Sequence, residues 1–158
     1  MISYVLLVVI TITLSAMVYS FLKFYLPSIR AECSEDIYLV VDSYSCNLQG
    51  QALTINLTNR GLFNVSGVFL RFAAEGRIVR QQINEGEEME LKGPGDNSPL
   101  APDQSTTQKT YSLTNRLEEE VENYVLEIQP AIFAEGNLVP CENAITTQPV
   151  VCANLSPT

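Results

Sequence analysis

The sequence contains no histidine among its 158 residues. Histidine is the side chain that titrates nearest to neutral pH, and it is the commonest general base and metal ligand in proteins. Its absence excludes every Ser-His and Cys-His catalytic arrangement. A glycine-rich phosphate-binding loop and a nucleophile elbow are also missing from the sequence. The composition therefore favours a protein that is not an enzyme, and we expect neither a cofactor nor a metal site.

Basic residues are scarce as well. Nine lysines and arginines stand against eighteen aspartates and glutamates, which gives a net charge of −9. Proteins that bind nucleic acids present a basic face to the phosphates, so we expect no nucleic-acid partner. The apolar fraction of 46% is large enough for a folded core.

Charged side chains are absent from residues 1–22, and the first ones to appear are Lys23 and Arg30. Of the first 26 residues 20 are apolar or aromatic, and neither glycine nor proline occurs before Pro27. A helix over residues 1–26 would be about 39 Å long at about 1.5 Å per residue. That length exceeds the hydrocarbon thickness of a bilayer, which is about 30 Å.

This apolar segment lacks the features of a cleaved secretory signal, which are a basic start, a short apolar core and a small-residue cleavage site. One interpretation is a plain single-span membrane anchor. The other is a retained apolar helix whose short basic leader has been removed. The basic residues after the span would place the large domain in the cytoplasm by the positive-inside rule. A removed leader would resolve the conflict between that rule and the extracytoplasmic features described next.

The four cysteines are Cys33, Cys46, Cys141 and Cys152. An even number beside a membrane segment favours disulfides formed in an oxidising compartment. Of the three connectivities we predict the sequential one, Cys33–Cys46 and Cys141–Cys152, which closes two short loops worth about 3 kcal/mol each. Free buried cysteines and a zinc site are the alternatives, although neither pair has the short spacing of zinc knuckles.

Three N-x-S/T sequons begin at Asn56, Asn64 and Asn154. Each match alone is weak, because such triplets are frequent in chains rich in Asn, Ser and Thr. Together with the cysteines they fit a glycosylated domain outside the cytoplasm.

The polar part of the chain shows strand patterns. Residues 53–59 alternate strictly between apolar and polar side chains, as a half-buried strand does. Clear strands are also expected at 37–44, 65–74, 124–128, 132–134, 138–139 and 145–152, with weaker ones at 77–83, 89–91 and 110–113. Pro130 is expected to interrupt a strand, and residues 92–109 are expected to form a long loop.

Seven to nine short strands at this spacing indicate an antiparallel sandwich. We therefore predict an α+β protein, in which a long hydrophobic helix precedes an all-β, immunoglobulin-like sandwich. The expected divisions are a helix at 1–26, a connector at 27–36 and the head domain at 37–158.

Two acidic runs are candidates for calcium sites, because carboxylate oxygens are calcium ligands. They comprise Glu85, Glu87, Glu88 and Glu90, and then Glu118, Glu119, Glu120 and Glu122. Runs of this kind are more often solvated faces, and that is the interpretation we favour.

The opening ISYVLLVVITITLSAMVYSFLKFYLP (2–27) resembles the mature N-terminus of archaeal type IV pilin-like subunits. LTINLTNRGLFNVSGVFLRF (53–72) resembles the early strands of the sandwich heads in that family. Bacterial pilins usually carry glutamate at the fifth mature position, where this chain has Val5. The resemblance therefore favours an archaeal filament over a bacterial one.

The resemblance implies that a prepilin peptidase removes a short leader and that the subunit waits in the membrane before assembly. It also implies a membrane platform and an ATPase as assembly partners, and further copies of the chain as the main partner. A helix that is apolar on all sides must be surrounded by apolar material, which in a filament is other copies of the helix. The residues expected to line this polymerisation helix are Tyr4, Leu7, Ile10, Leu14, Val18, Phe21 and Tyr25.

The function expected from these features is that of a structural subunit of an extracellular helical filament for adhesion or motility. The alternative is a membrane-anchored sandwich that displays a binding surface and does not polymerise.

Overall fold

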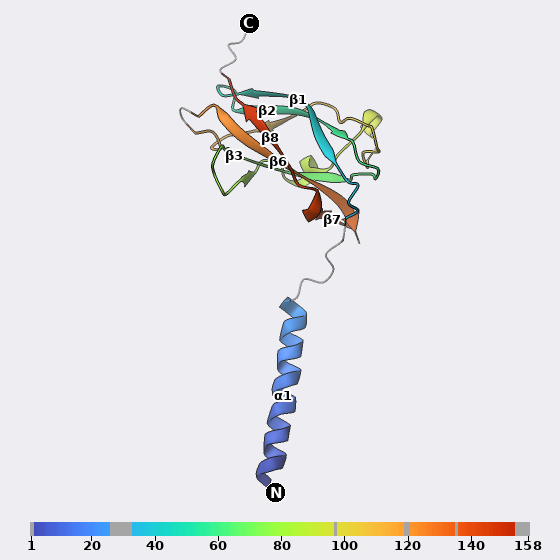
Figure 1. Ribbon diagram of the computed structural model, residues 1–158, viewed down its shortest axis with the longest axis vertical. Helices are drawn as coiled ribbons and strands as arrows, with labels where there is room; N and C mark the ends of the chain where they lie inside the picture. Colours follow the sequence, from blue (N-terminus) through green and yellow to red (C-terminus); the bar gives the residue numbers. More distant parts are fainter. Residues whose placement is uncertain (1, 26–32, 97, 119–120, 135, 154–158) are drawn as a thin grey trace. The chain divides into compact units, whose positions relative to one another are not determined.

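The structure is a computed structural model that describes residues 2–25, 33–96, 98–118, 121–134 and 136–153. The chain divides into two compact units, Met1–Arg30 and Ala31–Thr158. The first contains one long helix, and the second, called the head below, is built from antiparallel strands (Figure 1). The expected α+β class is confirmed.

The helix α1 spans Ile2–Tyr25 without a glycine or proline. Many of its residues are β-branched, which lowers helix propensity in water. In an apolar environment the backbone must satisfy its hydrogen bonds within the segment, and a helix does this. The hydroxyls of Thr11, Thr13 and Ser20 donate to backbone carbonyls three or four residues earlier, at 2.8 to 3.0 Å. These polar side chains are therefore satisfied inside the helix.

The head has eight strands among its described residues, together with three short 3₁₀ segments. The strands are β1 (Leu39–Asn47), β2 (Ala52–Asn59), β3 (Gly67–Ala74), β4 (Gln81–Gln82), β5 (Lys109–Ser112), β6 (Asn123–Ala134), β7 (Asn137–Pro140) and β8 (Thr146–Val151). The 3₁₀ segments are η1 (Gly86–Met89), η2 (Pro94–Asp96) and η3 (Glu142–Ala144).

The strands form two antiparallel sheets. One has the order β1-β2-β5, and the other has the order β4-β3-β6-β7, with β8 also paired to β6. The pairs β2–β5 and β3–β6 join strands that are distant in the sequence. The head is thus held together mainly by long-range pairing.

The core draws its side chains from both sheets. In β2 the alternating residues Leu53, Ile55 and Leu57 are almost completely buried, as their period-2 pattern predicts. Phe72 of β3 and Tyr124 of β6 stack with ring centroids 4.8 Å apart. The Tyr124 hydroxyl accepts from the backbone N–H of Glu118 at 3.0 Å, so the buried phenol has a partner.

Pro130 does not interrupt a strand, contrary to the prediction. It lies within β6, opposite Val68 of β3. On the other side of β6, pairing with β8 stops at Ile128 and pairing with β7 starts at Ala131. The Pro130 carbonyl accepts from Cys141 on that side, at 2.8 Å. A proline nitrogen, which cannot donate, is tolerated where one strand partner gives way to the next.

Two weaker strands were also predicted wrongly in extent. Of residues 77–83 only Gln81 and Gln82 form a strand, and residues 89–91 make one isolated bridge, between Glu90 and Gly67. This segment still follows the edge of β3, because Ile83 donates to Leu70 at 2.9 Å and Leu91 donates to Ser66 at 3.0 Å. The side chain of Asn84 replaces ladder bonds by accepting from Leu70 and donating to the Val68 carbonyl.

The predicted cysteine pairing is wrong. The disulfides are Cys33–Cys141 and Cys46–Cys152, with Cα atoms 5.4 and 4.6 Å apart. Loop closure alone favoured the sequential pairs, but the segments between those cysteines are strands. At about 3.3 Å per residue, β1 carries Cys46 roughly 20 Å from its own start, far beyond disulfide reach of Cys33.

Candidate functional site

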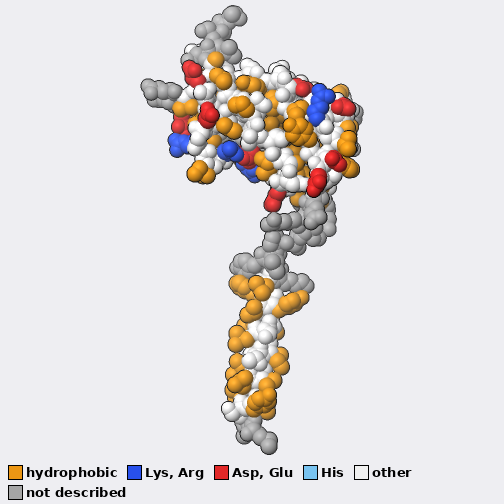
Figure 2. Space-filling view, viewed as in Figure 1, with side chains coloured by type: hydrophobic (Ala, Val, Ile, Leu, Met, Phe, Trp, Pro, Cys, Tyr) orange, Lys and Arg blue, Asp and Glu red, His pale blue; other side chains and the backbone are white. Residues whose placement is uncertain are grey.

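An extended apolar surface is exposed on α1. Side chains from Ser3 to Leu22 are all exposed. Figure 2 shows hydrophobic side chains along the visible face of the helix, while the head carries charges of both signs. The helix is long and apolar enough to cross a membrane. A segment of this kind requires lipid or other apolar helices around it.

The seven residues predicted to line the polymerisation helix follow one another at intervals of three or four. Six are described with their side chains, and their exposed fractions range from 48% for Ile10 to 75% for Tyr4. The side chain of Tyr25 lies outside the described residues. Residues at this spacing share one helical face, so the structure presents them as a mainly apolar stripe, on which Ser3 and Thr11 also lie.

Both disulfides join the early part of the head to its late part. Cys33 precedes β1 and is bonded to Cys141, directly after β7. Cys46, near the end of β1, is bonded to Cys152, directly after β8, and this bond links the two sheets. All four cysteines are paired. The disulfides indicate an oxidising compartment outside the cytoplasm.

The sequons occupy different environments. Asn56 lies half-buried in β2, the middle strand of its sheet, whereas Asn64 is exposed in the loop before β3. Asn154 lies outside the described residues. The two described sequons therefore differ in how readily the folded head accommodates an attached group.

The structure describes the whole of the first acidic run and part of the second. Glu85, Glu87 and Glu88 are exposed on and beside η1. Among the residues that the structure describes, no group of three histidine, cysteine, aspartate or glutamate side chains is placed to hold a metal ion. Glu119 and Glu120 of the second run lie outside the described residues.

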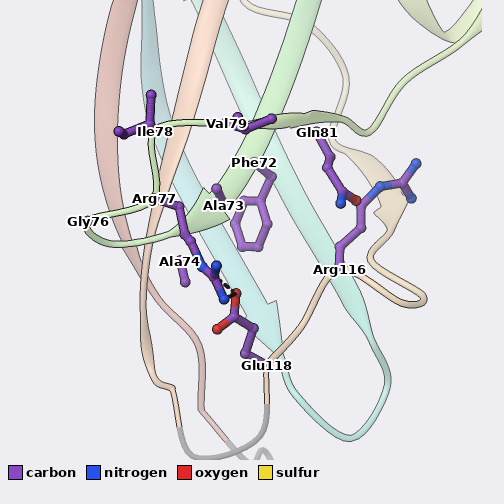
Figure 3. A pocket seen from close by; sticks show the side chains of 10 residues that line it. All are labelled: Phe72, Ala73, Ala74, Gly76, Arg77, Ile78, Val79, Gln81, Arg116 and Glu118. Carbon is purple, nitrogen blue, oxygen red and sulfur yellow. Dashed lines mark hydrogen bonds and ion pairs between the residues drawn. The ribbon is translucent and has the colours of Figure 1, made fainter.

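A shallow pocket of about 580 Å³ lies beside the loop that connects β3 to β4 (Figure 3). Arg77 and Glu118 form an ion pair at 2.9 Å across it, and the hydrogen bond and charge of Glu118 raise the pKa of Arg77. Ile78 and Val79, which line the same pocket, are 97% and 79% exposed. These exposed residues lie in the segment 77–83 that was predicted as a strand, although Glu75-Gly76 before it is a turn signal.

A second charged cluster fixes this loop to the sheet. Glu127 of β6 accepts from Arg71 of β3 at 2.6 Å and also from Arg80 at the end of the loop. Burial alone would raise the pKa of Glu127, but the hydrogen bonds and charges of the two arginines together outweigh burial and lower it. The two arginines thus keep the Glu127 carboxylate ionised. We interpret this cluster as one that stabilises the fold.

Burial also acts on two residues of β5. It lowers the pKa of Lys109, with a further contribution from the charge of Lys92. It raises the pKa of Tyr111 to about 12, with a smaller contribution from Glu88. The Lys109 ammonium donates to the Glu90 carbonyl at 3.0 Å. Burial and nearby charges therefore account for the pKa shifts of both residues.

The chain matches no known protein-family model. It also matches no curated protein. The apolar helix, the disulfides and the sequons are accordingly the features on which a functional proposal rests.

Proposed function

We propose that the chain is a structural subunit of an extracellular helical filament similar to archaeal type IV pili. In this proposal α1 packs with copies of itself in the filament core, and the head faces outward. The supporting observation is the exposed, predominantly apolar surface of α1, which has no charged residue from Ile2 to Leu22 and no glycine or proline. A filament for adhesion or motility would use such a helix in both of its environments, first lipid and then other helices.

The energetics of the proposed assembly follow from this double use. Burying a large apolar side chain is worth about 1.5–3 kcal/mol, so the whole helix represents tens of kcal/mol of gross transfer energy. Most of that gain is already present in lipid. Moving the subunit from the membrane into a filament is therefore not strongly downhill, and we expect assembly to need a membrane platform and an ATPase.

A filament can grow only if the contacts between subunits do not close into a ring or a dimer. An open helical filament forms from heterologous contacts, in which two different surfaces of the subunit meet. The stripe from Tyr4 to Phe21 covers one side of α1, while exposed residues such as Val5 and Ile12 lie on another side. Two or more helix faces are thus available for neighbours on different sides.

We also propose that the head is an immunoglobulin-like sandwich. Its antiparallel strands, its two sheets with a shared core, and the disulfide Cys46–Cys152 between the sheets support this assignment. An experimental structure of the head tests it directly. Sheets that do not pack face to face through core residues such as Ile55 of β2 and Phe72 of β3 would contradict it.

The test of the main proposal is electron microscopy of sheared cells, with an antibody against the head as the label. We expect thin filaments decorated along their length, and none from cells that lack the chain. A chain found only as single copies in the membrane fraction would contradict the proposal. That outcome would favour the anchored binding module instead.

A further inference from the structure

An apolar groove lies on the head beside one of the sequons. The groove has a volume of about 450 Å³ and is lined by Ser34, Ile37, Leu62, Phe63, Asn64 and Ile132. Leu62 and Phe63 are 72% and 49% exposed, so large apolar side chains face the solvent here. An apolar surface of this kind is more stable when something covers it. The sequon asparagine itself forms part of the lining.

Asn56 is poorly placed to carry a large attached group. It lies in β2, opposite Ser43 of β1, and its Oδ1 atom accepts from the Thr106 hydroxyl at 3.3 Å. The backbone of Leu57 exchanges hydrogen bonds with Thr106 on the other side. Neighbouring chain segments thus flank Asn56 on both sides. The Asn56 side chain is half-buried beside Thr106, so an attached group has less room there than on an exposed loop.

The hydroxyl of the same sequon is also engaged. Thr58 is 2% exposed, and its hydroxyl donates to the Asp42 carboxylate and lies 2.6 Å from the Ser105 hydroxyl. Drawing that hydroxyl away from its partners would break the hydrogen bonds of a buried side chain, which is costly. A glycan attached to Asn56 before folding would therefore lie beside a buried hydrogen-bond network that the folded head resists rearranging.

Asn64 has the opposite environment. It is exposed, and it lies in the loop between β2 and β3 rather than in a strand. No hydrogen bond from its side chain occurs within the described residues, so an attached group would displace no described side-chain partner. The groove beside it is open on the same surface.

We propose that Asn64 carries an N-linked glycan in the mature protein, that the first sugars of this glycan lie in the adjacent groove, and that Asn56 is unmodified. The inference requires only that the head matures outside the cytoplasm. It is therefore independent of whether the chain forms filaments.

The modification is a transfer from a lipid-phosphate-linked oligosaccharide by a membrane glycosyltransferase. The side-chain nitrogen Nδ2 of Asn64 forms a bond to C1 of the first sugar. The bond between C1 and the lipid phosphate oxygen breaks, and the lipid phosphate leaves with its electron pair. The amide loses one N–H proton to a base of the transferase.

The surroundings suit a sugar ring. One face of a pyranose ring consists of C–H groups and packs against aromatic and aliphatic side chains, while its hydroxyls remain in water. Phe63 and Leu62 provide that apolar surface, and Ser34 lines the groove as a polar residue. A glycan attached to Asn64 would thus cover the exposed side chains of its own loop.

The sequon hydroxyl fixes the order of events. Ser66 is only 8% exposed and its hydroxyl accepts from the Phe133 N–H at 3.4 Å. A transferase that must contact this hydroxyl can do so only before the head closes around it. Transfer to Asn64 therefore precedes completion of the fold, and the folded head then retains the glycan in its groove.

The first test is glycopeptide mapping of the full-length chain from its own cells, with Asn64→Gln and Asn56→Gln as matched variants. We expect the Asn64 peptide to carry a glycan and the Asn64→Gln chain to lose one glycan mass. The Asn56→Gln chain should keep the wild-type glycan mass. A glycan on Asn56, or an unmodified Asn64 peptide, would overturn the assignment.

The second test measures whether the groove is covered. Hydroxyl-radical labelling of Phe63 should rise several-fold in Asn64→Gln relative to the wild type. Phe133 has the same exposed fraction of 49% and lies outside the groove lining, so its labelling should not change. Equal labelling of Phe63 in both chains would show that the glycan does not occupy the groove. Protection of Phe63 in Asn64→Gln that depends on protein concentration would also overturn the proposal, because it would identify a second copy as the occupant.

Discussion

The disulfide between Cys33 and Cys141 joins residues 108 apart in the sequence whose Cα atoms are 5.4 Å apart. It ties the segment before β1 to the segment after β7. The second disulfide ties the end of β1 to the end of β8 over a separation of 106. The first strand of the head is therefore covalently held at both ends by the late part of the chain.

Removing the first disulfide by Cys33→Ala with Cys141→Ala should destabilise the head by about 2–5 kcal/mol. With Cys46–Cys152 still in place, the loop that is no longer closed in the unfolded chain has roughly 25 residues and runs through that second disulfide. The sequence contains no tryptophan, so denaturant unfolding is best followed by tyrosine fluorescence or circular dichroism. Peptide mapping without reduction should recover the links Cys33–Cys141 and Cys46–Cys152. Recovery of Cys33–Cys46 would contradict the structure.

Local patterns predicted local structure well. The alternation in residues 53–59 located β2 to within one residue of its observed bounds, Ala52–Asn59. The apolar opening segment predicted a helix, and α1 spans Ile2–Tyr25 within it. In both cases the prediction uses only the pattern of apolar and polar residues that are close together in the sequence.

Features that depend on distant partners were predicted poorly. The effect of Pro130 depends on where the pairing partner of β6 changes from β8 to β7. The residues 124–134 themselves carry no signal for that position. The disulfide pairing depends on β1 lying near β8, a contact between strands about a hundred residues apart. The groove beside Asn64 also needs the folded head, because it combines Ser34, Ile132 and the 62–64 loop.

Glu127→Gln should destabilise the head by about 1–3 kcal/mol at pH 7, because a neutral amide replaces the carboxylate that forms ion pairs with Arg71 and Arg80. The carboxylate side chain is only 12% exposed. Unfolding in denaturant measures the difference. Glu118→Gln is the matched control, because its ion pair with Arg77 is largely exposed and should contribute little.

A comparison of the wild type with Glu127→Gln also tests how the stability depends on pH. The pKa of Glu127 is lowered in the folded head, below the ordinary value of 4.5. Its contribution is therefore fully present above that ordinary value and is lost as the pH falls through the lower, folded value. The stability difference between wild type and Glu127→Gln should shrink as the pH falls below about 4. A difference that stays constant down to about pH 2 would contradict this cause.

Gly61→Ala should destabilise the head by about 1–3 kcal/mol, as expected for overpacking. A Cβ atom on Gly61 would collide with the Asp36 carbonyl oxygen and would lie 2.7 Å from the Tyr38 nitrogen. These backbone atoms cannot move away freely, because Leu62 donates to the Asp36 carbonyl and Gly61 donates to the Tyr38 carbonyl. The matched control is Gly50→Ala, whose Cβ would meet only the side chain of Asn47, at 3.3 Å. Equal unfolding midpoints for the two variants would contradict the predicted clash.

The final prediction concerns the helix. Ile10→Asp and Leu14→Lys should each abolish filaments, because they place a charge in the middle of the apolar stripe on α1. Insertion scales assign about 2.5–3.5 kcal/mol against one such charge at the centre of a membrane helix. In a filament the cost recurs in every subunit, and neighbouring copies bring like charges together. Electron microscopy of sheared cells measures the outcome.

Membrane insertion is the control for these variants, since a subunit that fails to insert would give no filaments for a trivial reason. Leu14→Ile should be much milder than Leu14→Lys, because the side-chain volume is nearly conserved and no charge is added. The disulfides and the core of the head are unchanged in all three variants, so the head should fold normally. A charged variant that inserts at the wild-type level and still yields filaments of wild-type length would contradict a core built from α1. A non-polymerising anchor predicts instead that filaments are absent from the wild type as well as from every variant.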